Sequence, residues 1–327
     1  MNIELRITKN DSERRLDRVL RKAFQDMPIS AIHRLFRKKC VLLDGKPAYP
    51  FTITKEGETL LVKHAVQNKN SCMGEAANET KPQAVSCKHK LRDKAQILFE
   101  GNGILVLNKI CGIASHGENS LETLAACYLK DKIMPSLSFK SGPLHRLDKP
   151  TSGIITFSTS LEGARHFSFL MQNGLIKKTY LAIMEGVIED YALWEDFVTR
   201  DTRIKKTFVT STNNMQDAKT ALSTVRRIAH NTNLSLVSVE IETGRTHQIR
   251  ACAAHHKHPL MGDKKYGSKR ETPFFLHAMS MEFPKDNQFG IQKINASPPE
   301  EFLKTIEILF KEDRTRFCAE SQQNLRY

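Results

Sequence analysis

The chain has 327 residues, which is enough for two domains, one of them with a large buried core. Its 50 lysines and arginines against 36 acidic residues give a net charge of +14 and a pI of about 9.4. That balance favours a polyanionic partner, and nucleic acid rather than a membrane. No stretch is long and apolar enough to cross a bilayer, and residues 1–11 lack the apolar core of a signal peptide. We therefore expect a cytoplasmic protein, and seven scattered cysteines argue against a disulfide framework.

Residues 13–63 carry the pattern of a small unit of two helices and a hairpin. Asp44-Gly45 follows the apolar run 41–43 and precedes a later extended run, which indicates a tight hairpin. Residues 59–62 predict a further strand, and Ser30 is expected to cap the second helix. The apolar residues at helical spacing are Leu16, Val19, Leu20 and Ala23 in the first helix and Ile32, Leu35 and Phe36 in the second.

The composition changes after this unit. Residues 65–94 begin with a polar stretch that shows no period, which predicts a flexible linker. Helices are predicted over residues 120–129 and 161–172, and strands and helices alternate irregularly rather than as repeated βαβ units. This irregular order predicts a mixed α+β domain over residues 95–310. The charged tail, residues 311–327, is expected to fray.

An informative run lies at residues 145–153, which read His-Arg-Leu-Asp-Lys-Pro-Thr-Ser-Gly. The apolar, β-like residues 154–157 follow it, so Asp148 is expected on a loop that a strand anchors. Loops held by rigid strands are common places for chemistry. The alternative interpretation is that Asp148 caps a turn and pairs with Arg146, because Asp, Ser, Gly and Pro dominate turns.

Two further segments contain residue types suited to chemistry. Residues 237–242 alternate between apolar and polar like a half-buried strand, and Gly244 permits a turn ahead of Arg245 and Arg250. Each arginine offers a planar fork for a carboxylate or a phosphate, and the alternative is a surface basic patch. Tyr180 lies in a strand-like run, where the alternative to a functional role is core filling with a solvated hydroxyl.

Cysteine and histidine crowd together between residues 247 and 258, which raises the question of a metal site. Only Cys252 and His255 have the spacing of a ligand pair, and no second pair matches it, so we expect no metal. The segment also continues as a helix from Gln248 to before Pro259. No Walker or dinucleotide glycine motif appears, so no nucleotide cofactor is expected.

Taken together, these segments resemble the RluA family of RNA pseudouridine synthases, over roughly residues 95–290. Two departures concern substrate detail rather than the proposed site. Ile110-Cys111 stands where the family usually has proline, and Ala251-Cys252 stands where it has valine and histidine. The segments that carry the resemblance, in the family's order, are Asn108-Lys109 with Gly112 and His116, His145 to Asp148 with Thr151 to Gly153, Lys178 and Tyr180 with Gly186, residues 243–250, residues 262–267, and Leu276 to Ala278.

The resemblance implies a largely antiparallel sheet flanked by helices, with the active cleft across the sheet. It implies Asp148 as the catalytic carboxylate, which must be ionised to act as nucleophile or base. It also implies Arg250 as the cation that pairs with this carboxylate and Tyr180 as the ring that lies against the target base. The target uridine is expected to flip out of folded RNA. No cofactor is expected, because the isomerisation oxidises nothing and needs no energy donor.

RNA contacts are expected in two places. Near the catalytic carboxylate, Arg146 is expected to fill the gap that the flipped base leaves, with His145 beside it, and Arg245 and Lys109 are expected to hold RNA backbone. The N-terminal pattern, residues 13–64, resembles the S4 RNA-binding module, whose second helix presents cations to phosphates. The alternative for that helix is a solvated charged face. The basic residues expected along it are Arg34, Arg37, Lys38 and Lys39.

The resemblance therefore predicts an enzyme that isomerises specific uridines to pseudouridine in structured RNA. Large-subunit ribosomal RNA is the expected substrate, because the N-terminal arrangement is most similar to that of enzymes acting there. Transfer RNA is one alternative, and a catalytically silent RNA-binding or ribosome-assembly protein is another. A monomer is expected.

Overall fold

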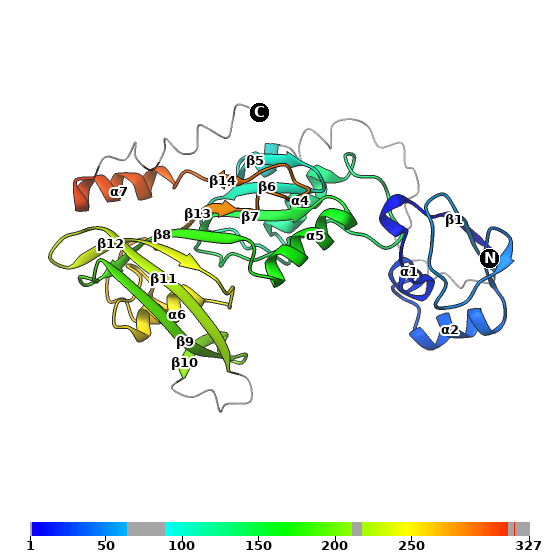
Figure 1. Ribbon diagram of the computed structural model, residues 1–327, viewed down its shortest axis with the longest axis horizontal. Helices are drawn as coiled ribbons and strands as arrows, with labels where there is room; N and C mark the ends of the chain where they lie inside the picture. The colour runs from blue at the N-terminus through cyan, green and yellow to red at the C-terminus, as the bar shows by residue number, and fades with distance from the viewer. Residues whose placement is uncertain (1, 64–88, 211–217, 313–316, 318–327) are drawn as a thin grey trace.

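The computed structural model describes residues 2–63, 89–210, 218–312 and 317. Two separate sheets divide them into an N-terminal module, residues 3–62, and a larger main body. Each part has its own cluster of buried apolar side chains. Figure 1 shows the module, in blue, at one end of an elongated molecule, and residues 191–241, in green to yellow, at the other end.

The N-terminal module is a four-stranded antiparallel sheet in the order β1-β4-β2-β3, packed against two helices through a shared apolar cluster. Asp44 and Gly45 have positive φ values of 48° and 76°, which suit a two-residue hairpin turn between twisted strands. The predicted hairpin and both predicted helices are therefore present. The elements are β1 (Ile3–Arg6), α1 (Leu16–Ala23), α2 (Ile29–Arg37), β2 (Val41–Leu43), β3 (Lys46–Pro47) and β4 (Thr59–Val62).

Two expectations for this module are wrong. Strand β1 pairs with β4, so the module begins near residue 3 rather than at residue 13. Four residues with alternating exposure are too short a pattern to identify without the partner strand. Ser30 is not the N-cap of α2, because Pro28 holds that position and Ser30 lies in the first turn. Proline is tolerated there, since the first amides of a helix have no partner within the helix.

The main body is built on a ten-stranded sheet in the order β10-β9-β11-β12-β8-β13-β7-β6-β5, with β14 beside β13. Within the described residues every strand pair is antiparallel except β13 with β7. This confirms the predicted α+β class with a mainly antiparallel sheet. The strands are β5 (Ala95–Gly101), β6 (Ile104–Lys109), β7 (Ser152–Ser158), β8 (Lys177–Glu185), β9 (Tyr191–Asp201), β10 (Lys206–Thr210), β11 (Lys219–His230), β12 (Leu234–Ile241), β13 (Leu276–Glu282) and β14 (Lys293–Asn295).

Helices flank this sheet on both faces. Alternate residues of β8 enter two different apolar clusters, since Tyr180 and Ala182 join the main cluster while Leu181 and Ile183 pack with α7. The α5 helix spans the predicted residues, and the Ser160 hydroxyl accepts a hydrogen bond from the amide of its first turn. The helices are α4 (Leu121–Leu129), α5 (Leu161–Gln172), α6 (Gln248–His255) and α7 (Glu300–Phe310).

The predicted ends of the main body need correction. Most of the predicted linker, residues 65–94, lies outside the described residues, but Leu91 is fully buried in the main cluster. The linker therefore ends before residue 91. The predicted tail, residues 311–327, also lies largely outside the described residues, yet Phe317 is buried in the cluster that includes α7. At that position the expectation of a frayed end is wrong.

The thiols and the helices bear on two further expectations. Among the described cysteines, Cys127 is disulfide-bonded, whereas Cys40, Cys111 and Cys252 are free. One bonded cysteine is not a disulfide framework, so the expectation drawn from the cysteine count stays a prediction. In the part of the chain that the structure describes, no helix combines the length and apolar character needed to cross a membrane.

Candidate active site

A cavity of about 390 Å³ opens between the loop before β7 and the loop that joins β12 to α6. Its volume falls in the range of small-molecule sites. Three segments singled out in the sequence meet there. They are residues 145–153, which lead into β7, strand β8, and residues 243–250, which lead into α6. The lining residues are Leu144 to Asp148, Thr151, Met171, Lys178, Tyr180, Ile241, Gly244 to Arg250, and Leu276.

Asp148 lies on the loop before β7, and its neighbours in sequence hold it there. Leu147 is buried, and its backbone exchanges two hydrogen bonds with the Ser115 hydroxyl, at 2.7 Å and 3.2 Å. On the other side, the Thr151 amide donates to the Asp148 carbonyl at 3.0 Å. The side chain of Asp148 is therefore placed by backbone contacts on both sides of it.

Lys109 is fully buried, so the expected contact between Lys109 and RNA backbone is wrong. Its ammonium donates to the carbonyls of Ile110, Ile113 and Lys149, at 3.0, 3.0 and 3.3 Å. Burial lowers the pKa of Lys109 to about 8, even though the charge of Asp148 opposes this shift. Lys109 thus ties two loops together next to Asp148, and its three donors are all used within the protein.

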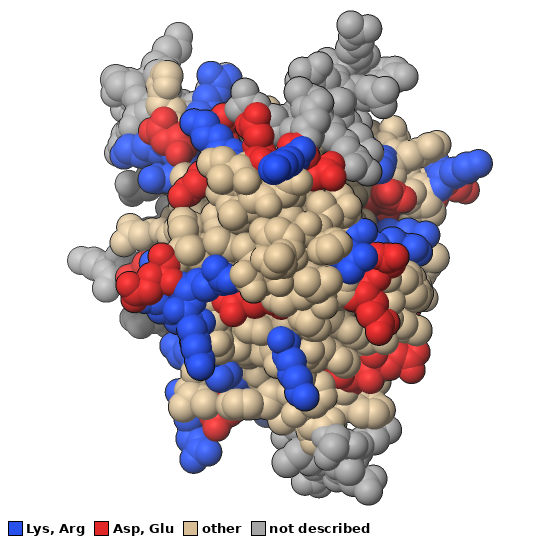
Figure 2. Space-filling view, turned by 90° about the vertical axis from the view of Figure 1, so that its left-hand side faces the viewer, with Lys and Arg blue, Asp and Glu red and all other residues tan. Residues whose placement is uncertain are grey.

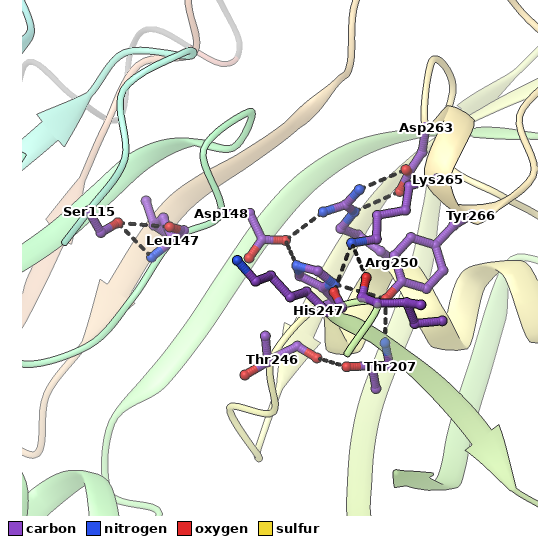
Figure 3. A network of polar contacts seen from close by, with 12 residues as sticks. Ser115, Leu147, Asp148, Thr207, Thr246, His247, Arg250, Asp263, Lys265 and Tyr266 are labelled. Atoms are coloured by element: carbon purple, nitrogen blue, oxygen red, sulfur yellow. Dashed lines mark hydrogen bonds and ion pairs between the residues drawn. The ribbon is translucent and has the colours of Figure 1, made fainter. Parts of the chain in front are cut away.

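Arg250 joins two carboxylates (Figure 3). Its Nη1 donates to Oδ2 of Asp148 at 2.9 Å, and its Nε and Nη2 donate to Asp263 at 2.7 Å and 2.8 Å. Arg250 is 7 % exposed, and its guanidinium lies over the rings of Tyr266 and Phe274. Burial by itself lowers the pKa of Arg250, but the hydrogen bonds and charges of the two carboxylates outweigh it and raise that pKa. A permanent cation beside a carboxylate favours the ionised carboxylate.

The imidazole of His247 is the second group that approaches Asp148. The backbone of His247 has a left-handed φ of 55°. Its Nε2 lies 3.5 Å from Oδ2 of Asp148, and its Nδ1 lies 2.9 Å from the Tyr266 hydroxyl. That hydroxyl accepts the Thr207 amide at 2.9 Å. Burial lowers the pKa of His247, against the attraction of Asp148. Among the described residues, no hydrogen bond engages Oδ1 of Asp148, so this oxygen is the one available to a ligand.

Strand β8 contributes two side chains to the same cavity. Tyr180 is 8 % exposed, and burial, followed by the charge of Asp148, raises the pKa of its hydroxyl, so the hydroxyl stays protonated at neutral pH. Lys178 is 6 % exposed, and burial lowers its pKa to about 8. The structure therefore brings Asp148, Tyr180 and Arg250, the three predicted catalytic residues, into one cavity.

The other predicted RNA contacts lie in different surroundings. Arg146 and Arg245 line the cavity and are exposed to solvent, so both can reach a bound polyanion. The basic residues of the second helix are exposed on α2 and its C-terminal cap, outside this cavity. They are Arg34, Arg37 and Lys38.

His145 is held by the protein itself. Its Nε2 accepts the Thr156 amide at 3.0 Å, and its ring stacks on Phe167 with centroids 5.9 Å apart. Burial lowers the pKa of His145 to about 3, so the ring is neutral at physiological pH. It lines the cavity without adding positive charge, which does not favour the expected contact with a phosphate.

Sequence reasoning attached no role to Asp263, His247 or Tyr266, although all three lie in segments that it singled out. The 3₁₀ turn at Lys264–Tyr266 follows Asp263 and brings its carboxylate back to Arg250. A buried arginine needs its donors satisfied, and one carboxylate does not saturate a guanidinium. That requirement is the signal that could have pointed to a second acid.

The cysteine and histidine cluster does not converge on a metal site. His256 stacks on Trp194 with ring centroids 4.6 Å apart, and its Nε2 lies 3.2 Å from the carboxylate oxygens of Asp196. His258 Nδ1 lies 2.9 Å from the carbonyl of Glu185. Within the described residues, no group of three or more possible ligands gathers.

Comparison with known proteins shows what the chain is similar to. Residues 103–255 match a family model described as RNA pseudouridylate synthase. The chain is 29% identical to ribosomal large subunit pseudouridine synthase C of Pasteurella multocida, over 93% of each chain. It is 27% identical to the protein of the same name from Vibrio vulnificus, over 93% of this chain and 95% of that one.

Solved structures agree on the fold. Human RNA pseudouridylate synthase domain containing 4 matches with a TM-score of 0.56 and 19% identity, over 72% of this chain and 97% of that chain. Human RNA pseudouridylate synthase domain containing 1 gives a TM-score of 0.54, also at 19% identity, over 72% and 96%. By the family model and these relatives, the chain is therefore similar to RNA pseudouridylate synthases, and it shares their fold.

Proposed function

We propose that this chain converts specific uridines of large-subunit ribosomal RNA to pseudouridine, with Asp148 as the catalytic carboxylate. The observation that carries the proposal is the pairing of Asp148 with Arg250 at the wall of a cavity that also contains Tyr180. The substrate class rests on the relatives, which are named for the ribosomal large subunit and align with this chain over almost their whole length.

The proposed reaction is an isomerisation in which all atoms are retained. The bond from C1′ of the ribose to N1 of uracil breaks, the base turns, and a bond from C1′ to C5 forms. C5 loses a proton and N1 gains one, so no cofactor is consumed. Asp148 acts as nucleophile or base through Oδ1, while Arg250 and His247 hold Oδ2 and fix the direction of the carboxylate.

The cavity suits a base that has left its helix. Tyr180 presents a ring from a rigid strand for stacking against uracil, and its protonated hydroxyl is able to take part in proton movement. Arg146, exposed two residues before Asp148, is placed to fill the gap left in the RNA. Arg245 lines the same cavity and is placed to hold a neighbouring phosphate.

We extend the proposal to the N-terminal module. An S4-like role in binding RNA is supported by the two-helix and hairpin arrangement and by the exposed cations of α2. The enzyme is proposed to act as a cytoplasmic monomer.

Replacement of the carboxylate tests the proposal. Asp148→Asn keeps the shape of the side chain but removes its charge, so pseudouridine formation is expected to fall by at least about 10³-fold. Pseudouridine is mapped by carbodiimide-induced reverse-transcription stops in RNA from cells with the intact gene, a deletion or the variant. Asp131→Asn, at an exposed position outside the cavity, serves as the control and is expected to retain activity.

The sites that disappear identify the substrate. Loss of large-subunit positions in both the deletion and Asp148→Asn supports the whole proposal. Loss of transfer RNA positions instead assigns the substrate elsewhere and keeps the mechanism. Loss of pseudouridine positions in the deletion strain but not in Asp148→Asn would mean that Asp148 is not the catalytic residue. Unchanged pseudouridine in both strains favours a catalytically silent RNA-binding protein.

A further inference from the structure

A second cavity lies between the N-terminal module and the main body, and residues of both parts line it. Its volume is about 350 Å³. Among the described residues that line it, the charged ones are Arg14 and Lys22 from the module and Lys140 from the main body, and none is a carboxylate. Leu144 lines this cavity and also the cavity that contains Asp148. We call this second cavity the inter-module groove.

A buried carboxylate fixes the two walls of the inter-module groove relative to each other. Asp11 of the module accepts hydrogen bonds from the hydroxyls of Ser136 and Ser138, each at 2.7 Å, and from the amides of Leu137 and Ser138, at 3.0 Å and 2.8 Å. Arg14 also donates to the Ser138 hydroxyl at 2.8 Å. Hydrogen bonds to an ionised acceptor are short and strong, so the groove is formed before any ligand arrives.

The segment of the main body that lines the groove leads directly to Asp148. The amide of Leu144 donates to the carbonyl of Thr156 at 2.8 Å, and the amide of Ser158 donates to the carbonyl of Gly142 at 2.9 Å, which aligns this segment with β7. The four Cα–Cα steps from Leu144 to Asp148 span at most about 14 Å. Since a helical nucleic-acid strand rises about 3.4 Å per nucleotide, the edge of the groove at Leu144 lies within about four nucleotides of a base bound at Asp148.

The cations around the groove repel one another. Burial lowers the pKa of Arg14, and the positive charge of Arg165 is the next contribution in the same direction, with Arg18 adding to it. The opposing attraction of Asp11 does not cancel these contributions. Mutual repulsion of this kind marks an excess of positive potential, which a bound polyanion relieves.

We infer that the inter-module groove binds the sugar–phosphate backbone of the RNA that flanks the target uridine, with Lys22 and Lys140 in contact with phosphates. This inference rests on the proposed function, because RNA in the Asp148 cavity is what makes RNA the polyanion nearest to the groove. Both lysines are exposed, and neither has a hydrogen-bonding role in the docking of the module. They are therefore suitable positions for substitution.

The test is a charge reversal in the full-length protein. Lys22→Glu combined with Lys140→Glu is compared with Lys55→Glu combined with Lys285→Glu, which makes the same change of charge at exposed lysines outside the groove. The substrate is a transcript of the ribosomal RNA domain that contains the mapped uridine. For the groove variant we expect KM to rise about 10–100-fold with kcat little changed, and the slope of log affinity against log salt to become shallower by about 1.4, from two lost phosphate contacts.

A photo-crosslinking residue in place of Lys140 adds a positional readout. The eight steps from Lys140 to Asp148 span at most about 29 Å, so a crosslink is expected within about eight nucleotides of the target. The inference is overturned if KM of the groove variant equals that of the control pair, or if the crosslink maps to distant RNA. Equal melting temperatures for the two variants exclude misfolding. If the intact enzyme makes no pseudouridine, the proposed function fails. The affinity for RNA and its dependence on salt still show whether the inter-module groove binds RNA.

Discussion

Lys178 and Tyr180 enter the cavity together because residues i and i+2 of a strand share a face. Burial lowers the pKa of Lys178 from its ordinary value of 10.5 to about 8, so its ammonium remains mostly protonated at pH 7. A buried ammonium costs folding free energy, and an enzyme that binds a polyanion gains from keeping it. Lys178 thus lowers the stability of the fold and adds a positive charge to the cavity.

Lys178→Met is expected to raise the free energy of unfolding at pH 7 by roughly 1–3 kcal/mol. The sign follows from proton binding, because between pH 8 and 10.5 the unfolded chain holds the Lys178 proton more tightly than the folded chain. The free energy of unfolding of the wild type therefore rises with pH across that window. The difference in this free energy between the variant and the wild type becomes smaller. Urea unfolding from pH 7 to 10.5 measures it. Lys177→Met, on the same strand but exposed, is the control and should show no such difference.

The sequence predicted some of these residues and not others for a physical reason. Asp148, Tyr180 and Arg250 stand in short motifs that resemble those of the RluA family, and their roles were predicted from that resemblance. Lys109 also stands in such a motif, but its burial arises only when β6 pairs with β5 on one side and β7 on the other. The role of Asp263 comes from its contact with Arg250. A local sequence pattern does not predict contacts between segments.

Strand β7 is the element that connects the Asp148 loop to the rest of the sheet. Gly153 has a φ of 109° and pairs with Ala278 of β13 in the parallel register. A Cβ at residue 153 would lie 2.3 Å from the Ala278 carbonyl oxygen. The close approach of the two backbones at this point therefore requires glycine.

Gly153→Ala is expected to destabilise the protein by more than about 3 kcal/mol, because both the clash with backbone and the left-handed φ oppose the methyl group. Chemical unfolding followed by fluorescence or circular dichroism measures the change. Gly112→Ala is a matched comparison, since Gly112 has a φ of 88° and a Cβ added there would meet nothing within 4 Å. A cost limited to about 1–2 kcal/mol is expected there. Equal costs at the two glycines would contradict the close-approach argument.

Elements with strong local pattern were predictable. The α5 helix has a capping serine and a length that fits its apolar spacing, and the Asp44-Gly45 turn has residues that tolerate positive φ. Strands β9 and β11 were not specified by the prediction, although they form one of the longest pairings of the sheet. Exposed residues such as Leu193 interrupt the expected contrast between buried and solvated faces of β9. Whether such a segment forms a strand depends on its pairing with another strand some twenty residues away, as expected for antiparallel sheets.

At the scale of the whole molecule, the net charge of +14 is not spread as one positive surface. Figure 2 shows the end of the molecule at the left of Figure 1, where Lys and Arg side chains mix with Asp and Glu around a broad uncharged area. The inter-module groove has cations without carboxylates among its lining residues. Its position depends on how the N-terminal module docks on the main body.

Asp11→Ala is expected to loosen that docking without unfolding either part, because each part has its own apolar cluster. The amides of Leu137 and Ser138 then lose their acceptor, and their hydrogen exchange is expected to accelerate at least about tenfold, which corresponds to 1.4 kcal/mol. Mass spectrometry of peptides across this loop measures it. Asp17→Ala, which removes a contact with Arg15 inside the module, should leave the loop unchanged. Unchanged exchange in Asp11→Ala would assign the docking to other contacts.

The chain of contacts from Thr207 through Tyr266 and His247 to Asp148 has a direction. A backbone amide can only donate, so the Tyr266 oxygen must accept from Thr207, and its own hydrogen is free to point at Nδ1 of His247. The neutral ring then carries its hydrogen on Nε2, turned toward Asp148. The Thr207 amide at one end thus favours the imidazole tautomer at the other, in which Nδ1 of His247 accepts from Tyr266. Among substitutions of Thr207, only proline would remove this amide hydrogen.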